Sequence, residues 1–315
     1  MSSISIVILC TILAYMCLLI GVGIYNAKKN NSSEDFYLGG RKMGALVVAM
    51  SAEASDMSSW LLMGLPGVAY LTGLADAFWT AAGLAIGTYL NWLFTSRRLR
   101  RYSERIGAIT VPTFFAKRFH DEKNIITAIS AVIIVIFFVP YVASGFAACG
   151  KLFNSLFGLD YMTGVIIFAI IIVIYTIMGG FTTVATNDLI QSIVMSIALV
   201  SIVTFGVSNA GGMGAVMDNA KSLSGYLSLS AIHDAVAGTA IPYSPLTAVS
   251  LLAWGIGYFG MPHILVRFMS IEDEQKLVLS RRVASIWVTF AMGIAIFIGI
   301  VGLAVVNAGG MAPLE

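Results

Sequence analysis

An apolar segment of about residues 43–72 contains the polar run Ser51-Ala52-Glu53-Ala54-Ser55-Asp56-Met57-Ser58-Ser59-Trp60, which is followed by Gly64-Leu65-Pro66-Gly67. The run carries two carboxylates and four hydroxyls. A charged side chain at the centre of a bilayer costs about 2.5–3.5 kcal/mol, so such residues usually face a cavity and mark an ion or substrate path. Small residues also favour local unwinding, which exposes backbone carbonyls as oxygen ligands. The run therefore indicates a Na⁺ site; a structural hydrogen bond between helices is the alternative.

The composition places this segment in a membrane protein. Of 315 residues, 58% are hydrophobic and 11% charged, whereas soluble domains average about 45–50% and about 25%. A soluble globular protein is thereby excluded. Because each helical crossing needs about 20 mostly apolar residues, we expect an all-α, polytopic membrane protein with about eight transmembrane helices, at about residues 4–27, 43–72, 74–95, 125–150, 161–178, 188–207, 246–268 and 283–307.

The distribution of positive charge predicts the orientation. Sixteen of the 18 lysines and arginines fall within residues 28–42, 97–123 and 267–282, and only Lys151 and Lys221 fall elsewhere. Because cytoplasmic loops are enriched in Lys and Arg, we expect these three segments inside and the N-terminus outside. Residues 208–245 then form an outer loop with a short helix. The net charge of +2 is too balanced to suggest nucleic acid as a partner.

A second irregular segment reads Trp254-Gly255-Ile256-Gly257-Tyr258-Phe259-Gly260-Met261-Pro262-His263. Its three glycines and one proline weaken a helix. Trp254 and Tyr258 are four residues apart, so on one helical face they would stack as two walls of a small pocket; ordinary packing is the alternative. In transporters built of inverted repeats, two interrupted apolar segments in the sequence indicate where the binding site lies.

Enzyme chemistry is not supported by any motif. The sequence has no GxSxG elbow and no HExxH or CxxC spacing, and its three cysteines lie within apolar stretches. We therefore expect no enzymatic activity and no cofactor. A solute sensor would need a signalling domain, which these residues do not contain. The turn Gly179-Gly180-Phe181 precedes a polar run through Asp188, which is typical of a tight turn and a helix N-cap.

Several motifs together resemble the sodium/solute symporter family, in its proline branch. They are Phe36-Tyr37-Leu38-Gly39-Gly40-Arg41, the run from Ser51 to Gly67, Tyr141-Val142-Ala143-Ser144-Gly145, Gly179-Gly180-Phe181, and Trp254 to Gly260 with Pro262-His263. The resemblance implies Na⁺-coupled symport of L-proline across the plasma membrane by alternating access, with Na⁺ as the coupling ion. Symport of another small solute, such as another amino acid or pantothenate, is the alternative.

The resemblance also implies a domain organisation. Residues 1–315 would form a single transmembrane transporter domain, part of a core of two inverted repeats of five helices. In it, residues 4–27 are an extra helix, residues 43–207 the first repeat, and residues 246–307 the start of an incomplete second repeat. Three core helices would then be missing. We expect the amino-terminal part of a symporter, either a truncated form, a non-transporting fragment or a chain completed by a partner.

Site residues follow from the matching motifs. As the resemblance implies, Na⁺ would be bound by the backbone carbonyls of Ala54 and Met57, with Asp56 an essential carboxylate near the ion and Ser58 a hydroxyl between ion and substrate. Arg41 would be a functional charge and Asp188 a residue tied to Na⁺ dependence. The proline pocket would be lined by Tyr141, Trp254, Tyr258 and Pro262. Aromatic faces can hold an apolar ring and its cationic nitrogen together.

Overall fold

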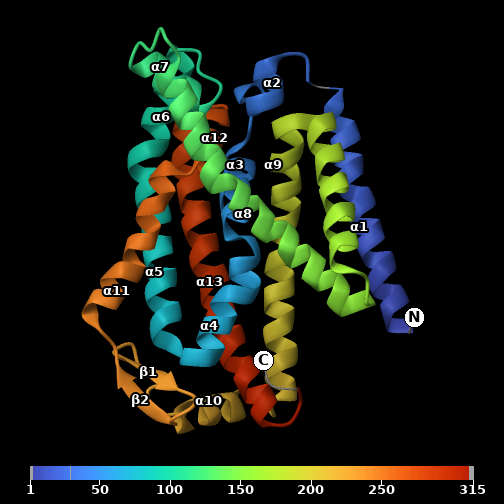
Figure 1. The fold of residues 1–315 in the computed structure, drawn as a ribbon, viewed down its shortest axis with the longest axis vertical. Helices are drawn as coiled ribbons and strands as arrows, with labels where there is room; N and C mark the ends of the chain where they lie inside the picture. Colours follow the sequence, from blue (N-terminus) through green and yellow to red (C-terminus); the bar gives the residue numbers. More distant parts are fainter. Residues whose placement is uncertain (1–2, 29, 312–315) are drawn as a thin grey trace. The chain divides into compact units, whose positions relative to one another are not determined.

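The structure, a computed structural model, describes residues 3–28 and 30–311 and is built mainly of helices (Figure 1). The elements in chain order are α1 (Ser3–Ala27), α2 (Ser33–Leu38), η1 (Gly39–Arg41), α3 (Ala45–Ser59), η2 (Trp60–Gly64), α4 (Leu65–Thr72), α5 (Leu74–Asn91), η3 (Trp92–Ser96), α6 (Arg97–Arg105), α7 (Val111–Arg118), α8 (Ile125–Phe157), α9 (Tyr161–Asn209), α10 (Met213–Ser222), β1 (Ala231–Asp234), β2 (Thr239–Pro242), α11 (Pro245–Leu252), η4 (Ala253–Gly260), α12 (Pro262–Ser270), η5 (Glu274–Lys276) and α13 (Leu277–Asn307).

Fewer helices qualify as spans than the eight expected. Across residues 3–28 and 30–311, four helices are long and apolar enough to cross a membrane, and five if α11, η4 and α12 count as one broken span. One reason is that α9 covers two expected segments, 161–178 and 188–207, in 49 residues. Another is that the expected segment 43–72 is divided into α3, η2 and α4. The count of eight and the inverted repeat are therefore not confirmed.

The reversal within α9 occurs at Gly180. This residue has φ 59° and ψ −155°, while the polar residues that follow it are helical. A Cβ at Gly180 would lie 2.7 Å from the carbonyl oxygen of Phe36, so a side chain would meet the backbone of α2. Glycine is thus required both for its positive φ and for this close approach. The expected polar turn is replaced by a bend at one glycine.

The expected outer loop contains more structure than a short helix. Besides α10, it forms an antiparallel hairpin in which Ala231 pairs with Pro242 and Asp234 with Thr239. The Asp234 carboxylate accepts hydrogen bonds from the backbone N–H groups of Val236 (2.9 Å) and Ala237 (3.0 Å). These bonds lower the pKa of the Asp234 carboxyl and stabilise the turn between the two strands. The pattern of side chains in the sequence did not predict this hairpin.

The chain divides into two compact units. The first comprises residues 1–55, 96–190 and 262–280, and the second residues 56–95, 191–261 and 281–315. In the first unit, α12 packs on α6, and Met43 pairs with Ile271 in an isolated β-bridge. Figure 1 shows α1 running beside the first arm of α9, where a Cβ at Gly23 would lie 3.2 Å from Cβ of Tyr175.

In the second unit, glycines allow backbone contact between α5 and η4. A Cβ at Gly87 would lie 2.3 Å from Cα of Gly255, and one at Gly83 would lie 2.6 Å from Cα of Leu252. Small residues permit helices to approach this closely. The fully buried Tyr226 donates a hydrogen bond of 2.7 Å to the carbonyl oxygen of Ala69. The close approaches at Gly83 and Gly87 hold the segment of Trp254 and Tyr258 against α5.

Candidate functional site

The helix predicted to hold the ion is interrupted. Within α3, Ser58 has φ 40° and ψ −158°, and a π-helical turn, η2, follows directly. Positive φ is uncommon for a residue other than glycine. The boundary between the two units falls between Ser55 and Asp56. Ala54 therefore belongs to the first unit, while Asp56, Met57 and Ser58 belong to the second.

Asp188 is the centre of a buried polar cluster in the first unit. Its carboxylate accepts hydrogen bonds from the hydroxyls of Ser51 (2.6 Å) and Ser55 (3.1 Å). The Arg267 guanidinium forms an ion pair with it at 2.8 Å, and the two side chains are only 5% (Arg267) and 12% (Asp188) exposed. A buried charge is tolerated when it is paired and hydrogen bonded, and this carboxylate meets both conditions.

Arg267, which was counted above among the cations of the expected cytoplasmic segments, is a buried residue. Its Nε donates to the Ser51 hydroxyl at 2.6 Å, its Nη2 also donates to Ser55, and its guanidinium lies over the Phe181 ring at 5.8 Å. The position of Arg267 could have indicated its burial, because the residue lies within the apolar helix α12 rather than after it. The partner of its charge, on α9, could not be identified from the sequence.

Tyr141 joins the same cluster through its hydroxyl, which donates to the backbone carbonyl of Ser55 at 2.7 Å. Its ring stacks on the His263 ring with centroids 5.7 Å apart. The Phe138 ring also contacts His263, edge to face, with centroids 5.3 Å apart. Both ring nitrogens of His263 are buried without a hydrogen-bond partner among the described residues. Pro262 begins α12. In the first unit, Tyr141 is thus tied to the backbone of the interrupted helix.

The second unit brings together two predicted residues of different roles. The side chain of Asp56, predicted near the ion, interacts with the side chain of Tyr258, predicted in the solute pocket. Tyr258 is 3% exposed, and its backbone carbonyl accepts a hydrogen bond of 2.9 Å from Nδ2 of Asn91. The Tyr258 side chain is therefore fixed next to the carboxylate.

The expected stacking of Trp254 on Tyr258 is not found. Residues Ala253–Gly260 form a 3₁₀-helix, in which residues three apart, not four, share a face. Trp254 is 50% exposed and pairs instead with Trp60, with ring centroids 5.5 Å apart, whereas Tyr258 is buried. The glycines that interrupt the helix also remove the spacing on which the stacking argument depended.

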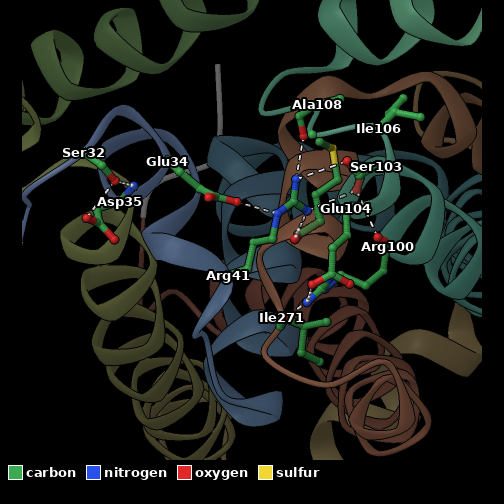
Figure 2. A network of polar contacts seen from close by, with 12 residues as sticks. Ser32, Glu34, Asp35, Arg41, Arg100, Ser103, Glu104, Ile106, Ala108 and Ile271 are labelled. Atoms are coloured by element: carbon green, nitrogen blue, oxygen red, sulfur yellow. Dashed lines mark hydrogen bonds and ion pairs between the residues drawn. The ribbon is translucent and has the colours of Figure 1, made fainter.

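Arg41 lies in a separate network of the first unit (Figure 2). This buried residue has φ 53° and follows two glycines that also have positive φ. Its guanidinium donates to the carboxylate of Glu34 (2.7 Å), the hydroxyl of Ser103 (3.1 Å), and the carbonyl oxygens of Met269 (2.9 Å) and Ala108 (2.6 Å). One side chain thereby joins α2, the end of α6 and α12.

The segment before Arg41 is capped locally. The Ser32 hydroxyl donates to the Asp35 carboxylate at 2.8 Å and accepts from the Asp35 N–H at 3.1 Å. The first of these bonds lowers the pKa of the Asp35 carboxyl. Reciprocal capping of this kind fixes the start of a short helix, and so helps to position Glu34 opposite Arg41.

The donor chemistry of these clusters suits a hard cation rather than a transition metal. Across residues 3–28 and 30–311, no group of three or more His, Cys, Asp or Glu side chains is placed to bind a metal. The available donors are hydroxyls, backbone carbonyls and isolated carboxylates. Such oxygens are the ligands that hard cations prefer.

Comparison with known proteins identifies relatives. The model of the sodium:solute symporter family matches residues 36–313. Curated sodium/proline symporters of Staphylococcus aureus strains JH9 and NCTC 8325 are each 41% identical over 299 residues, covering 94% of this chain and 56% of theirs. The chain therefore spans little more than half the length of these relatives. A solved structure of a substrate-bound, outward-open Na⁺-coupled sialic acid symporter has the same fold, with a TM-score of 0.76 at 16% identity over 96% of this chain and 62% of that one.

Proposed function

This chain belongs to the sodium:solute symporter family, and from that premise we propose that it serves Na⁺-coupled symport of L-proline across the plasma membrane. Membership of the family makes it a transporter and not an enzyme. Because the chain spans 56% of its curated relatives, the activity is proposed for the whole protein to which this sequence corresponds. The choice of proline is supported by the 41% identity to sodium/proline symporters.

The observation that carries the proposal is the interaction between the side chains of Asp56 and Tyr258. We assign Asp56 to the ion and Tyr258 to the solute, so a cation that binds the carboxylate changes the charge that the Tyr258 side chain meets. Tyr258 is 3% exposed and cannot reorient without moving its neighbours. A coupling of this kind is reciprocal, so proline must raise Na⁺ affinity by the same factor as Na⁺ raises proline affinity.

For Na⁺ we propose the ligands Ala54 and Met57, through their backbone carbonyls, with Asp56 and Ser58 close to the ion. These residues lie within five consecutive positions of α3. The non-helical dihedrals at Ser58 interrupt the helical hydrogen-bond ladder there, and carbonyls at a helix end lack an intrahelical partner. Na⁺ would be transported cargo as well as a ligand. Among transporters, interrupted helices commonly supply such carbonyls near the middle of the bilayer.

For proline we propose Trp254 and Tyr258 in the second unit and Tyr141 and Pro262 in the first. Trp254 is half exposed and offers an aromatic face, and its ring packs on Trp60 with centroids 5.5 Å apart. Such a face attracts a cationic nitrogen and packs on an apolar ring. We also propose that Asp188, in the buried polar cluster, is required for Na⁺ dependence. Arg41, in its separate network, is proposed as a functional charge.

We further propose a multi-pass arrangement with eight spans, an outer N-terminus and alternating access by two inverted repeats. The position of the cations along the sequence supports this orientation. The domain bounds 43–207 and 246–307 remain part of this proposal. Proline and Na⁺ are the proposed partners, together with the lipid bilayer.

The test is uptake of labelled proline into proteoliposomes that contain the purified protein. We expect saturable accumulation that requires an inward Na⁺ gradient and collapses when the gradient is dissipated. A panel of unlabelled competitors, including other amino acids and pantothenate, identifies the preferred solute. If a competitor other than proline inhibits best at the lowest concentration, the proline assignment is wrong. Should uptake be independent of Na⁺, the coupling assignment is wrong as well.

A further inference from the structure

We propose that the exposed face of α6 binds the headgroups of anionic phospholipids. We call this face the α6 basic face and define it as Arg97, Arg98, Arg101 and Arg105, all of which are exposed. Arg97, Arg101 and Arg105 are spaced by four residues, so their side chains lie along one side of the helix. The inference concerns a surface apart from the proposed ion and proline sites.

The opposite face of α6 fixes this orientation. Leu99, Arg100 and Ser103 are buried. Arg100 donates through Nε to the carbonyl oxygen of Ile271 at 2.7 Å and pairs with Glu104 at 2.7 Å (Figure 2). Because the helix is held from one side, its other arginines cannot turn inward to find partners.

The charge on the basic face is largely uncompensated. Arg101 pairs with Glu274 at 2.6 Å, with exposed fractions of 68% (Arg101) and 32% (Glu274), and this arginine lowers the pKa of the Glu274 carboxyl. In the part of the chain that the structure describes, Arg97, Arg98 and Arg105 form no ion pair. A surface ion pair such as that of Arg101 is weak, so phosphate oxygens can replace Glu274.

Two observations favour a lipid over a soluble phosphate. First, Arg97 follows directly after the apolar segment that ends at about residue 95. In the membrane arrangement proposed above, on which this step rests, this is the cytoplasmic end of a span, where basic clusters attract anionic lipids. Second, α6 and α7 carry aromatic side chains, and the two helices are in contact through Tyr102 and Phe114. Tyr102 packs on Phe114 at 5.7 Å, Arg118 lies over the Tyr102 ring at 5.2 Å, and Phe115 and Phe119 at the end of α7 are exposed. Aromatic rings are enriched at the headgroup level, and a soluble anion would leave them in water.

The experiment measures which lipid stays bound. The protein is reconstituted in nanodiscs of equimolar phosphatidylglycerol and phosphatidylcholine, and the retained lipids are counted by native mass spectrometry after release into detergent. We expect several-fold enrichment of phosphatidylglycerol on the wild-type protein. The variant Arg97→Gln/Arg98→Gln/Arg105→Gln should lose most of it, and Lys at the same three positions should restore it, because charge is the common requirement.

A matched control neutralises the same number of exposed cations elsewhere, as Lys123→Gln/Lys151→Gln/Lys221→Gln, and should keep the enrichment. The single variant Arg105→Gln leaves the remaining α6 arginines to direct insertion, and should show a partial loss. Equal enrichment in the wild-type and triple Gln proteins overturns the proposal, as does an equal loss in the control. Displacement of the lipid by inorganic phosphate at millimolar concentration would assign the face to soluble anions instead. Uptake assays report on the proposed transport separately.

Discussion

Asp188 and Arg267 are 79 positions apart in the chain and form an ion pair of 2.8 Å in which neither side chain is more than 12% exposed. The hydroxyls of Ser51 and Ser55 contact both charged groups. Three segments, α3, α9 and α12, therefore meet at one buried polar cluster. Ser55 is the last residue of α3 in the first unit, so this cluster fixes the part of α3 that belongs to that unit.

Breaking this pair should destabilise the protein strongly. Asp188→Asn or Arg267→Met alone leaves a buried charge without its partner, which costs about 3–5 kcal/mol. The double variant should lose clearly less than the sum of the two. Free energies of unfolding from denaturant titration in detergent test this as a double-mutant cycle. As a control, the exposed pair Arg101–Glu274 should contribute less than about 1 kcal/mol. Additive losses for Asp188 and Arg267 would mean that they do not interact.

Removing the Tyr258 hydroxyl should alter Na⁺ dependence. Tyr258→Phe deletes the hydroxyl of the side chain that interacts with Asp56, and a polar group that contacts a charged group contributes about 1.5–3 kcal/mol. We expect the Na⁺ concentration for half-maximal proline uptake to change by about tenfold or more. Asp56→Asn should greatly raise the Na⁺ concentration needed for uptake while the protein still inserts. Tyr161→Phe, at an exposed position, serves as the control. Unchanged Na⁺ dependence in Asp56→Asn would remove this residue from the ion site.

Removing the exposed aromatic face should weaken proline binding selectively. Trp254→Ala is expected to cost about 1–2 kcal/mol in proline affinity if a desolvated cation–π contact is lost. The Na⁺ affinity of the same variant should change less. Equilibrium binding of labelled proline at saturating Na⁺, and of Na⁺ without proline, measures the two effects. An equal loss for both ligands would indicate damage to the fold rather than to a pocket.

The hydrogen bonds of Arg41 should keep the segment after α6 structurally ordered. Arg41→Gln removes the donors to Ser103, Met269 and Ala108, so amide hydrogen exchange across residues 103–108 should rise about tenfold or more. Arg41→Lys should be intermediate, because an ammonium group cannot reproduce the planar donor geometry of a guanidinium. Arg98→Gln, on the exposed side of α6, is the control and should leave exchange unchanged. Protection that survives in Arg41→Gln would show that other contacts order this segment.

The glycine contact between α5 and η4 should tolerate no side chain. In Gly87→Ala the new Cβ would lie 2.3 Å from Cα of Gly255, a backbone atom, so the helices must separate at a cost of about 1–3 kcal/mol. Gly293→Ala is the matched control, since a Cβ there meets nothing within 4 Å. That change should be neutral or stabilising by up to about 1 kcal/mol. Equal unfolding free energies for the two variants would contradict the close packing.

Several features were predictable because they depend on the local chain and on its solvent. The charged run from Ser51 to Asp56 within an apolar segment predicted an interrupted helix, and the structure has its non-helical residue at Ser58. The residues Gly179 and Gly180 predicted a turn, although not that the following polar residues would be helical. The long apolar stretches predicted a helical membrane protein, since backbone groups in lipid must be satisfied within the segment.

Composition, spacing and local motifs were enough to predict the class of protein, its interrupted segments and the family to which it belongs. The tertiary structure was needed to show which polar groups meet: Asp188 with Arg267, Tyr258 with Asp56, and Arg41 with Ser103 and Met269. It also decided that Trp254 pairs with Trp60 and not with Tyr258. The physical reason is that composition and spacing report local backbone preference and burial, whereas the partner of a buried charge depends on the path of the chain between distant residues.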